Sequence, residues 1–277
     1  MSTLLFDIGA TNTRLALLQE GHMGTVVHIR TDHAHDGFER LIAQMKVVAA
    51  GERIAQVVGG MRAQREGREG RLILDVNLTA WLGIPVRRRL EEAFGCPVWV
   101  ENDAVMAALG EAHLGAGIAR GVMAYVTVSS GVNFVRLVDG VADPTIARFE
   151  LGKQLIGDEN GRPVSLEALT SGVAMQRQFG RLPASIRNEH VWLGETEHLA
   201  RGLYNMMLYW APLRVVFGGS MMKDVDLPQL RSDLAAWPAV WPHELELVRA
   251  KLGDEAGLRG ALWLSRHPEV FERYSPT

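Results

Sequence analysis

FDIGATNTR, residues 6–14, joins two apolar runs through a turn of glycine, threonine and asparagine. Apolar runs of this length around such a turn predict a β-hairpin, with Asp7 at the end of its first strand. Small turn residues expose backbone N–H groups to an anion, and Thr11, Thr13 and Arg14 add hydroxyls and a cation. The segment therefore suits a phosphate-binding turn in which Asp7 holds Mg²⁺ through water, and it suits a plain hairpin turn equally.

A second predicted hairpin carries TVSSGVN, residues 127–133, between its strands. Thr127 and Ser130 offer hydroxyls there, and Gly131 gives a small turn residue. Two such turns indicate nucleotide binding better than one, because a triphosphate held between two lobes needs a phosphate cradle on each side. A third glycine element, Gly218-Gly219, allows a nucleotide base or ribose to approach the backbone, and a helix-entry turn explains it as well.

An acidic segment lies between the two turns, where an apolar run delivers Glu101, Asn102 and Asp103 to the start of an alanine-rich helix. Asn102 or Asp103 could simply cap that helix, and the spacing alone favours this interpretation. A carboxylate at a strand end facing a cleft is also what a hydroxyl nucleophile needs for proton removal in phosphoryl transfer. Both interpretations stay open on spacing alone.

Apolar runs alternate with helical patterns along the rest of the chain, which predicts two α/β lobes with mixed sheets. The second pair of predicted strands weakly repeats the opening hairpin. We place the boundary near residues 114–120, giving lobes 1–115 and 116–277, with a C-terminal helix at about 256–266 that packs back onto the first lobe. The predicted strands are 4–6, 15–18, 26–29, 54–58, 72–74, 98–100, 122–128, 134–138, 215–217 and 245–248, and the predicted helices are 37–50, 86–94, 103–114, 166–169, 195–210 and 256–264.

Composition excludes several classes of protein. A formal net charge of −3 over 277 residues gives no basic field for nucleic acid, and the basic stretch 62–71 is interrupted by glycines and glutamates, which predicts a solvated loop. One cysteine, Cys96, excludes an internal disulfide framework and a multi-cysteine zinc site, and indicates the reducing cytoplasm. The first residues lack a signal-peptide pattern, and no run approaches about 18 apolar residues, so we expect no membrane association.

The motifs together resemble the ROK family of sugar kinases and related repressors, in matching order from residue 3 to about 264. Residues 7–14 resemble its first phosphate motif, 101–111 its catalytic segment, and 166–172 the helix that follows its zinc site. The resemblance implies two actin/hexokinase-like (ribonuclease H-like) lobes with an interlobe cleft. It also implies a homodimer that uses ATP and Mg²⁺ to phosphorylate a hexose or N-acylhexosamine.

The same resemblance assigns roles to individual residues. Asp103 would be the base that accepts the proton of the sugar hydroxyl, and Asp7 would hold Mg²⁺ through water. The expected nucleotide-binding residues are Asp7, Gly9, Ala10, Thr11, Asn12, Thr13, Arg14, Thr127, Ser130, Gly131, Gly218 and Gly219. The expected sugar-binding residues are Asn77, Asn102, Asp103, Glu150, Lys153 and Glu167.

Departures from the family pattern keep other functions open. Lys153 stands where the family usually has a histidine and no cysteine follows, so no zinc site is expected and packing or oligomer contacts must order that loop. Ser129 and Asn133 replace glycines of the second phosphate turn, which favours a catalytically weak or inactive sugar-binding sensor as the alternative. A repressor would need a DNA-reading domain ahead of residue 3, so no nucleic-acid partner is expected.

Overall fold

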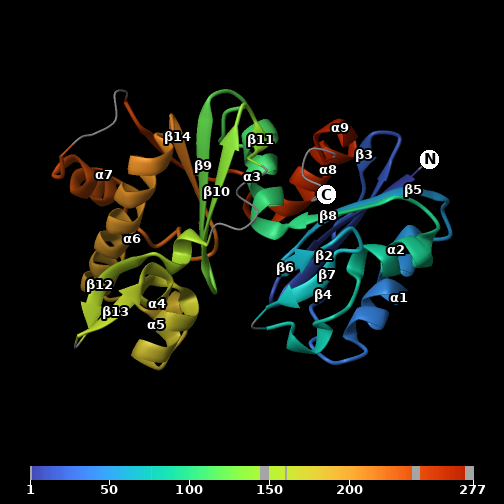
Figure 1. Cartoon of the computed structure of the whole chain (residues 1–277), viewed down its shortest axis with the longest axis horizontal. Coiled ribbons are helices and arrows are strands. Elements are labelled where there is room, and N and C mark those ends of the chain that lie inside the picture. Colours follow the sequence, from blue (N-terminus) through green and yellow to red (C-terminus); the bar gives the residue numbers. More distant parts are fainter. Residues whose placement is uncertain (1, 76, 144–149, 160, 239–243, 272–277) are drawn as a thin grey trace. The chain divides into compact units, whose positions relative to one another are not determined.

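The computed structural model describes residues 2–75, 77–143, 150–159, 161–238 and 244–271. It divides into two compact units: Met1–Leu114 with Asp254–Thr277 form one, and Gly115–Gly253 form the other (Figure 1). The predicted α/β class with mixed sheets is confirmed. None of the helices in the described ranges combines the length and apolar character needed to cross a membrane.

The first unit is built on a mixed sheet of strand order β3-β2-β1-β5-β8, with β4 paired to β2. Its opening hairpin is antiparallel, whereas β1, β5 and β8 run parallel. The strands are β1 (Ser2–Ile8), β2 (Asn12–Gln19), β3 (His22–Met23), β4 (Val27–Arg30), β5 (Ile54–Met61) and β8 (Val98–Asn102), and a small sheet pairs β6 (Gln64–Glu66) with β7 (Arg71–Leu74). The helices are α1 (Gly37–Ala49), α2 (Val86–Phe94), α3 (Asp103–Leu114), α8 (Ala256–Ser265) and α9 (Pro268–Phe271).

The two faces of this sheet pack against different helices. Leu4, Phe6 and Ile8 of β1 are fully buried in a cluster formed with α1 and α2. Because side chains alternate along a strand, Asp7 points to the opposite face, which packs against α8. The central strand is therefore buried throughout, and its one carboxylate lies beside the C-terminal helix.

The second unit repeats this strand order as β11-β10-β9-β14-β15, again with an antiparallel hairpin followed by parallel strands. The predicted repeat of the opening hairpin is therefore confirmed. The strands are β9 (Val122–Val128), β10 (Val132–Val138), β11 (Val141–Ala142), β14 (Arg214–Gly218) and β15 (Glu246–Arg249), with a separate hairpin of β12 (Leu155–Glu159) and β13 (Arg162–Ser165). The helices are α4 (Leu166–Thr170), α5 (Gly172–Phe179), α6 (Glu189–Trp210) and α7 (Leu227–Ala235), and the 3-10 helices of the two units are η1 (Thr79–Trp81), η2 (Leu151–Lys153), η3 (Pro183–Ser185) and η4 (Gly253–Glu255).

Two sequence-based predictions need correction. The basic stretch 62–71 is not a solvated loop, because it forms β6 and the start of β7, and Arg65 is well covered by protein. The long helix α6 begins at Glu189 rather than near 195. Asn188 caps it by accepting a hydrogen bond from the His190 N–H, and Trp192 packs against the core of its unit. Polar residues in its first turns conceal that start from a pattern of apolar spacing.

Candidate active site

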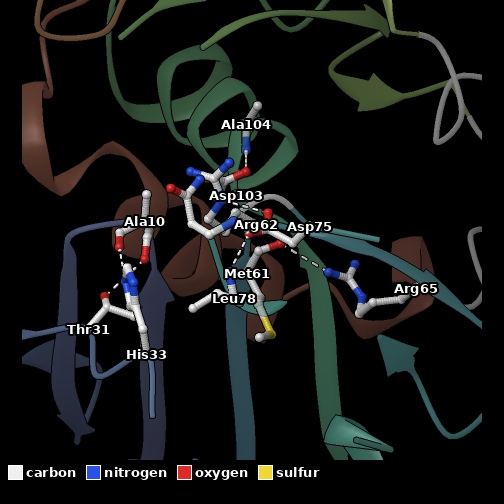
Figure 2. A network of polar contacts seen from close by, with 12 residues as sticks. Ala10, Thr31, His33, Met61, Arg62, Arg65, Asp75, Leu78, Asp103 and Ala104 are labelled. Atoms are coloured by element: carbon white, nitrogen blue, oxygen red, sulfur yellow. Dashed lines mark hydrogen bonds and ion pairs between the residues drawn. The ribbon is translucent and has the colours of Figure 1, made fainter. Parts of the chain in front are cut away.

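The predicted first phosphate turn, at residues 9–12, is held by hydrogen bonds from the segment that follows β4. Thr31 donates its hydroxyl to the Gly9 carbonyl at 2.9 Å, and a His33 ring nitrogen lies 2.6 Å from the Ala10 carbonyl (Figure 2). The Thr31 N–H also bonds the Thr11 carbonyl at 3.0 Å. The carbonyls of the turn are thus engaged by protein, while the Thr11 and Asn12 side chains are exposed and accessible to a ligand.

Asp7 is buried at the carboxyl end of β1 opposite Arg14, its cross-strand partner. Arg14 Nη1 lies 3.6 Å from Asp7 Oδ2, and Arg14 Nη2 lies 3.1 Å from Asp254 Oδ2. Burial and the nearby Asp103 carboxylate raise the pKa of Asp7 to about 7, although Arg14 opposes the rise. Gly257 of α8 allows this packing, since a Cβ there would lie 2.6 Å from the Asp7 Cγ.

Asp103 begins α3 directly after β8, as the sequence predicted. The helix is capped by Asn102, whose Oδ1 accepts hydrogen bonds from the Ala104 N–H at 2.9 Å and the Val105 N–H at 3.4 Å. Asp103 Oδ1 also accepts from the Ala104 N–H, at 2.9 Å. Burial raises the pKa of Asp103, and the Arg62 charge, the Ala104 N–H and the Arg65 charge oppose the rise. The capping interpretation therefore holds for Asn102 and leaves Asp103 Oδ2 free of that task.

Asn77 belongs to a turn organised by Asp75. Asp75 Oδ1 accepts hydrogen bonds from the Asn77 and Leu78 N–H groups, each at 2.7 Å, and Asp75 Oδ2 accepts one from Arg62 Nε at 2.7 Å. Arg62, Asp75 and Asp103 lie close together in Figure 2. The first unit therefore brings Asp7, residues 9–14, Asn77, Asn102 and Asp103 to one edge of its sheet.

The second predicted phosphate turn, residues 129–131, closes on itself through the Ser129 N–H and the Gly131 carbonyl at 2.8 Å. Ser130 at its tip is exposed. Asn133 Oδ1 accepts a hydrogen bond from the Phe134 N–H at 2.8 Å, so this side chain is turned onto its own strand. The Gly172 N–H, at the start of α5, bonds the Ser129 carbonyl at 2.7 Å and braces the turn.

Glu167, on the first turn of α4, connects this turn to Lys153. Glu167 Oε2 accepts a hydrogen bond from the Val132 N–H at 2.9 Å, and Glu167 Oε1 forms an ion pair with Lys153 Nζ. Lys153 ends η2, and its N–H bonds the carbonyl of the exposed Glu150 at 2.8 Å. Three expected sugar-binding residues of this unit therefore lie together, with the Glu167 carboxylate already engaged by protein groups.

The glycine pair at the end of β14 lies beside Thr127, because Gly218 is paired with Thr127 across the sheet. A Cβ at Gly218 would lie 2.1 Å from the Tyr125 hydroxyl oxygen, and Gly219 has φ +91°. Packing and backbone conformation thus require both glycines in this unit. Their role in nucleotide binding stays a prediction.

Residues 153–165, for which the sequence led us to expect no zinc site, include the β12–β13 hairpin. Gln154 attaches the start of this hairpin to α6. Gln154 Nε2 donates to the Gly202 carbonyl at 3.2 Å, and its Oε1 accepts from Asn205 Nδ2 at 3.1 Å. No group of three or more His, Cys, Asp or Glu side chains in the described ranges could hold a metal ion.

For Mg²⁺ bound through water, the buried Asp7 carboxylate beside Asp103 is chemically suited, because a cation would relieve the repulsion between the two.

Sequence reasoning missed several residues of this edge: Thr31, His33, Arg62, Asp75, Asp254 and Gly257. None belongs to a binding motif in its own segment. Thr31 and His33 follow β4, Arg62 follows β5 and Asp75 follows β7. Asp254 and Gly257 lie in η4 and α8, far along the chain from β1. Asp75, directly after a short apolar run and ahead of an asparagine, carried the one local signal, which is typical of an Asx turn.

Comparison with known proteins gives a consistent family. The sequence model of the ROK family matches residues 3–267. A bifunctional NanE/NanK enzyme of Brucella melitensis is 30% identical over 285 residues, covering 93% of this chain and 52% of that enzyme, so the chain spans about half of that relative. A fructokinase of Zymomonas mobilis is 29% identical over 205 residues, which cover 67% of each protein.

A solved structure agrees with these sequence relatives. The crystal structure of a ROK hexokinase from Thermus thermophilus matches with a TM-score of 0.74 and 28% sequence identity. The match covers 97% of this chain and 100% of that one. Similarity of this extent shows that the fold of both units is shared with that hexokinase.

Proposed function

Because this chain belongs to the ROK family, we propose that it is an ATP-dependent sugar kinase in which Asp103 is the general base. One observation carries the proposal: two carboxylates, Asp7 and Asp103, lie near each other at the same edge of the first unit's sheet and interact strongly enough to help raise the pKa of Asp7. Carboxylates placed this way serve distinct roles in phosphoryl transfer, one beside the nucleotide and one beside the attacking hydroxyl.

In the proposed reaction, Asp103 accepts the proton of a sugar hydroxyl while the oxygen of that hydroxyl attacks the γ-phosphorus of ATP. A new O–P bond forms, the bond between the γ-phosphorus and the bridging oxygen breaks, and ADP leaves with that electron pair. Asp103 suits this role because its Oδ1 is fixed by the Ala104 N–H, which orients Oδ2 for proton transfer. Mg²⁺, held through water by Asp7, would neutralise charge on the phosphates.

The nucleotide is proposed to contact the exposed turn at residues 9–12, Arg14, and in the second unit Thr127, Ser130 and Gly131 with Gly218-Gly219. Exposed hydroxyls and N–H groups at such turns recognise phosphate oxygens. The sugar is proposed to contact Asn77, Asn102, Glu150, Lys153 and Glu167. Relatives that include a fructokinase and a NanK-containing enzyme support a hexose or N-acylhexosamine as the acceptor.

The test is ADP release from Mg-ATP across a panel of hexoses, N-acetylhexosamines and pentoses, with Asp103→Asn beside the wild type. We expect sugar-dependent turnover that falls by about 10²–10⁴-fold in kcat in the variant, with sugar binding retained. Asp36→Asn is the matched control, because the Asp36 side chain is 66% exposed and pairs only with Arg40 among the described residues.

Two outcomes would contradict parts of this proposal. Full turnover in Asp103→Asn would show that another group accepts the proton. If no sugar elicits ADP release while one binds by calorimetry, the kinase assignment fails for the tested sugars. The chain would then act as a sugar-binding sensor, in keeping with Ser129 and Asn133 in place of turn glycines.

A further inference from the structure

Arg62 lies near two parts of the proposed sugar site, the turn that carries Asn77 and the Asp103 carboxylate. Its Nε donates to Asp75 Oδ2 at 2.7 Å, and its positive charge faces the Asp103 carboxylate. The Asp75 side chain is only 5% exposed, and its other oxygen holds the N–H groups of Asn77 and Leu78. The Arg62 guanidinium therefore pairs with Asp75, which organises the Asn77 turn, and lies close to the candidate base (Figure 2).

A second arginine, Arg65, fixes the backbone next to Arg62. Arg65 Nη1 donates to the Met61 carbonyl at 3.0 Å, and Arg65 Nη2 lies 3.4 Å from both the Val100 carbonyl and Glu101 Oε1. These contacts hold the end of β5 against the end of β8. Since Arg62 directly follows β5 and Asp103 directly follows β8, Arg65 keeps their backbones together, while Arg62 remains partly exposed at 22%.

The positive charge of Arg62 matters because most of the other charged groups around Asp103 are negative. Several other charged groups lie on the elements around Asp103: Asp7 of β1, Arg14 of β2, Arg65 of β6, Asp75 after β7, Glu101 of β8 and Asp254 of η4. Four of the six are carboxylates. Without the Arg62 charge, Asp75 would lose its cationic partner and Asp103 would face a more negative surrounding.

We propose that Arg62 is a positioning residue for phosphoryl transfer: it holds the Asn77 turn and the Asp103 carboxylate in one arrangement and keeps Asp103 ready to accept a proton. This inference rests on the proposed function and assigns a role to a residue that no motif marks. Arg62 acts through Asp75 and Asp103. Because its side chain pairs with the turn that carries Asn77, we expect a larger effect on the sugar than on ATP.

The experiment compares Arg62→Met and Arg62→Lys with the wild type in kinetics from pH 5.5 to 9. In Arg62→Met we expect the sugar KM to rise by about tenfold with little change in the ATP KM, because an ionic hydrogen bond is lost. Loss of the positive charge raises the pKa of Asp103, so the acid limb of the kcat/KM profile should move to higher pH. Arg62→Lys keeps the charge and should restore the limb while recovering the sugar KM only in part.

Arg201→Met is the control, because Arg201 forms an ion pair of the same length, 2.7 Å, with Glu197 on the exposed side of α6. A wild-type sugar KM and pH profile in Arg62→Met would overturn the proposal, as would a shifted limb that Arg62→Lys fails to restore.

A readout that needs no turnover separates this proposal from the kinase assignment. Amide hydrogen exchange at Asn77 and Leu78 reports their bonds to Asp75 directly. If the wild type turns over no sugar, exchange at these amides that is about tenfold faster in Arg62→Met still supports the Arg62–Asp75 connection. Unchanged exchange in that case would overturn it.

Discussion

At the scale of single residues, strand register decides which charges meet. Asp7 and Arg14 are opposite each other in the first hairpin, and alternation along β1 directs Asp7 toward α8. The same burial that makes Asp7 suitable beside a cation raises its pKa to about 7. The free energy of unfolding therefore includes a contribution from Asp7 that changes with pH.

Asp7 should make the metal-free protein less stable as pH rises. Its pKa in the folded state, about 7, exceeds the ordinary value of 3.8, so between those values the folded state binds more protons than the unfolded state. Stability from this group is fully present below pH 4 and is lost as pH rises to 7, by at most ~4 kcal/mol. The free energy of unfolding, measured by urea denaturation from pH 5 to 8, should no longer fall with pH in Asp7→Asn. At pH 8 the variant should be more stable than the wild type.

Asp254→Asn is the control for this prediction, because the Asp254 side chain also meets Arg14 but is 85% exposed. Asp254→Asn should keep most of the wild-type slope, because Asp254 is the smallest of the causes that raise the pKa of Asp7. A wild-type slope in Asp7→Asn as well would show that other groups control the pH dependence of unfolding.

At the scale of elements, the pairing of α3 with α8 positions the candidate base. The two helices approach so closely that a Cβ at Gly260 would lie 1.8 Å from the Met106 carbonyl oxygen. Helix α3 starts at Asp103 and α8 carries Gly257 beside Asp7. The relative position of the two carboxylates thus depends on a contact between helices far apart in the sequence.

Gly260→Ala should disrupt this pairing. The added methyl group cannot fit against the α3 backbone, so we expect a loss of about 1–3 kcal/mol in the free energy of unfolding and reduced turnover. Urea denaturation gives the first value and the ADP assay the second. Gly194→Ala on α6 is the control, because a Cβ there meets nothing within 4 Å, and replacing a helical glycine should raise stability by up to about 1 kcal/mol. Equal effects in the two variants would contradict the packing argument.

At the scale of the whole molecule, the two sheets share one strand order, but the units differ in continuity. Residues 115–253 form one unit from a single stretch of chain, whereas the other needs residues from both chain ends. In the latter, α8 contacts α3, β1 and β5. The final helix therefore completes the core of the N-terminal segment.

This continuity predicts how fragments behave. We expect a fragment of residues 115–253 to fold alone, giving a cooperative thermal transition and dispersed amide NMR signals. A fragment of residues 1–114 should not fold unless residues 254–277 are joined to it by a flexible linker, because α3 and β1 would otherwise expose apolar surface. Cooperative unfolding of residues 1–114 alone would contradict the division.

The sequence by itself determined the elements and the candidate chemistry. Apolar spacing placed the main strands and α1, α2, α3, α4 and α8, because burial of one face imposes the period of each element. Asp7, the turn at 9–12 and Asp103 were predictable since each stands in a local motif. Helices α5 and α7 and the β12–β13 hairpin were missed because short or polar segments carry little periodic signal.

Tertiary structure alone decided which side chains surround these motifs. Arg62 and Arg65 looked like part of a solvated stretch, yet the pairing of β5 with β8 places them against Asp103 and Glu101. Asp254 and Gly257 reach Asp7 only because α8 returns to the first sheet. The spacing of apolar residues in a sequence shows which face of a single helix or strand is buried. Contacts between elements depend on packing across a long separation in the chain, so the partners that set the pKa values of Asp7 and Asp103 could be found only in the folded protein.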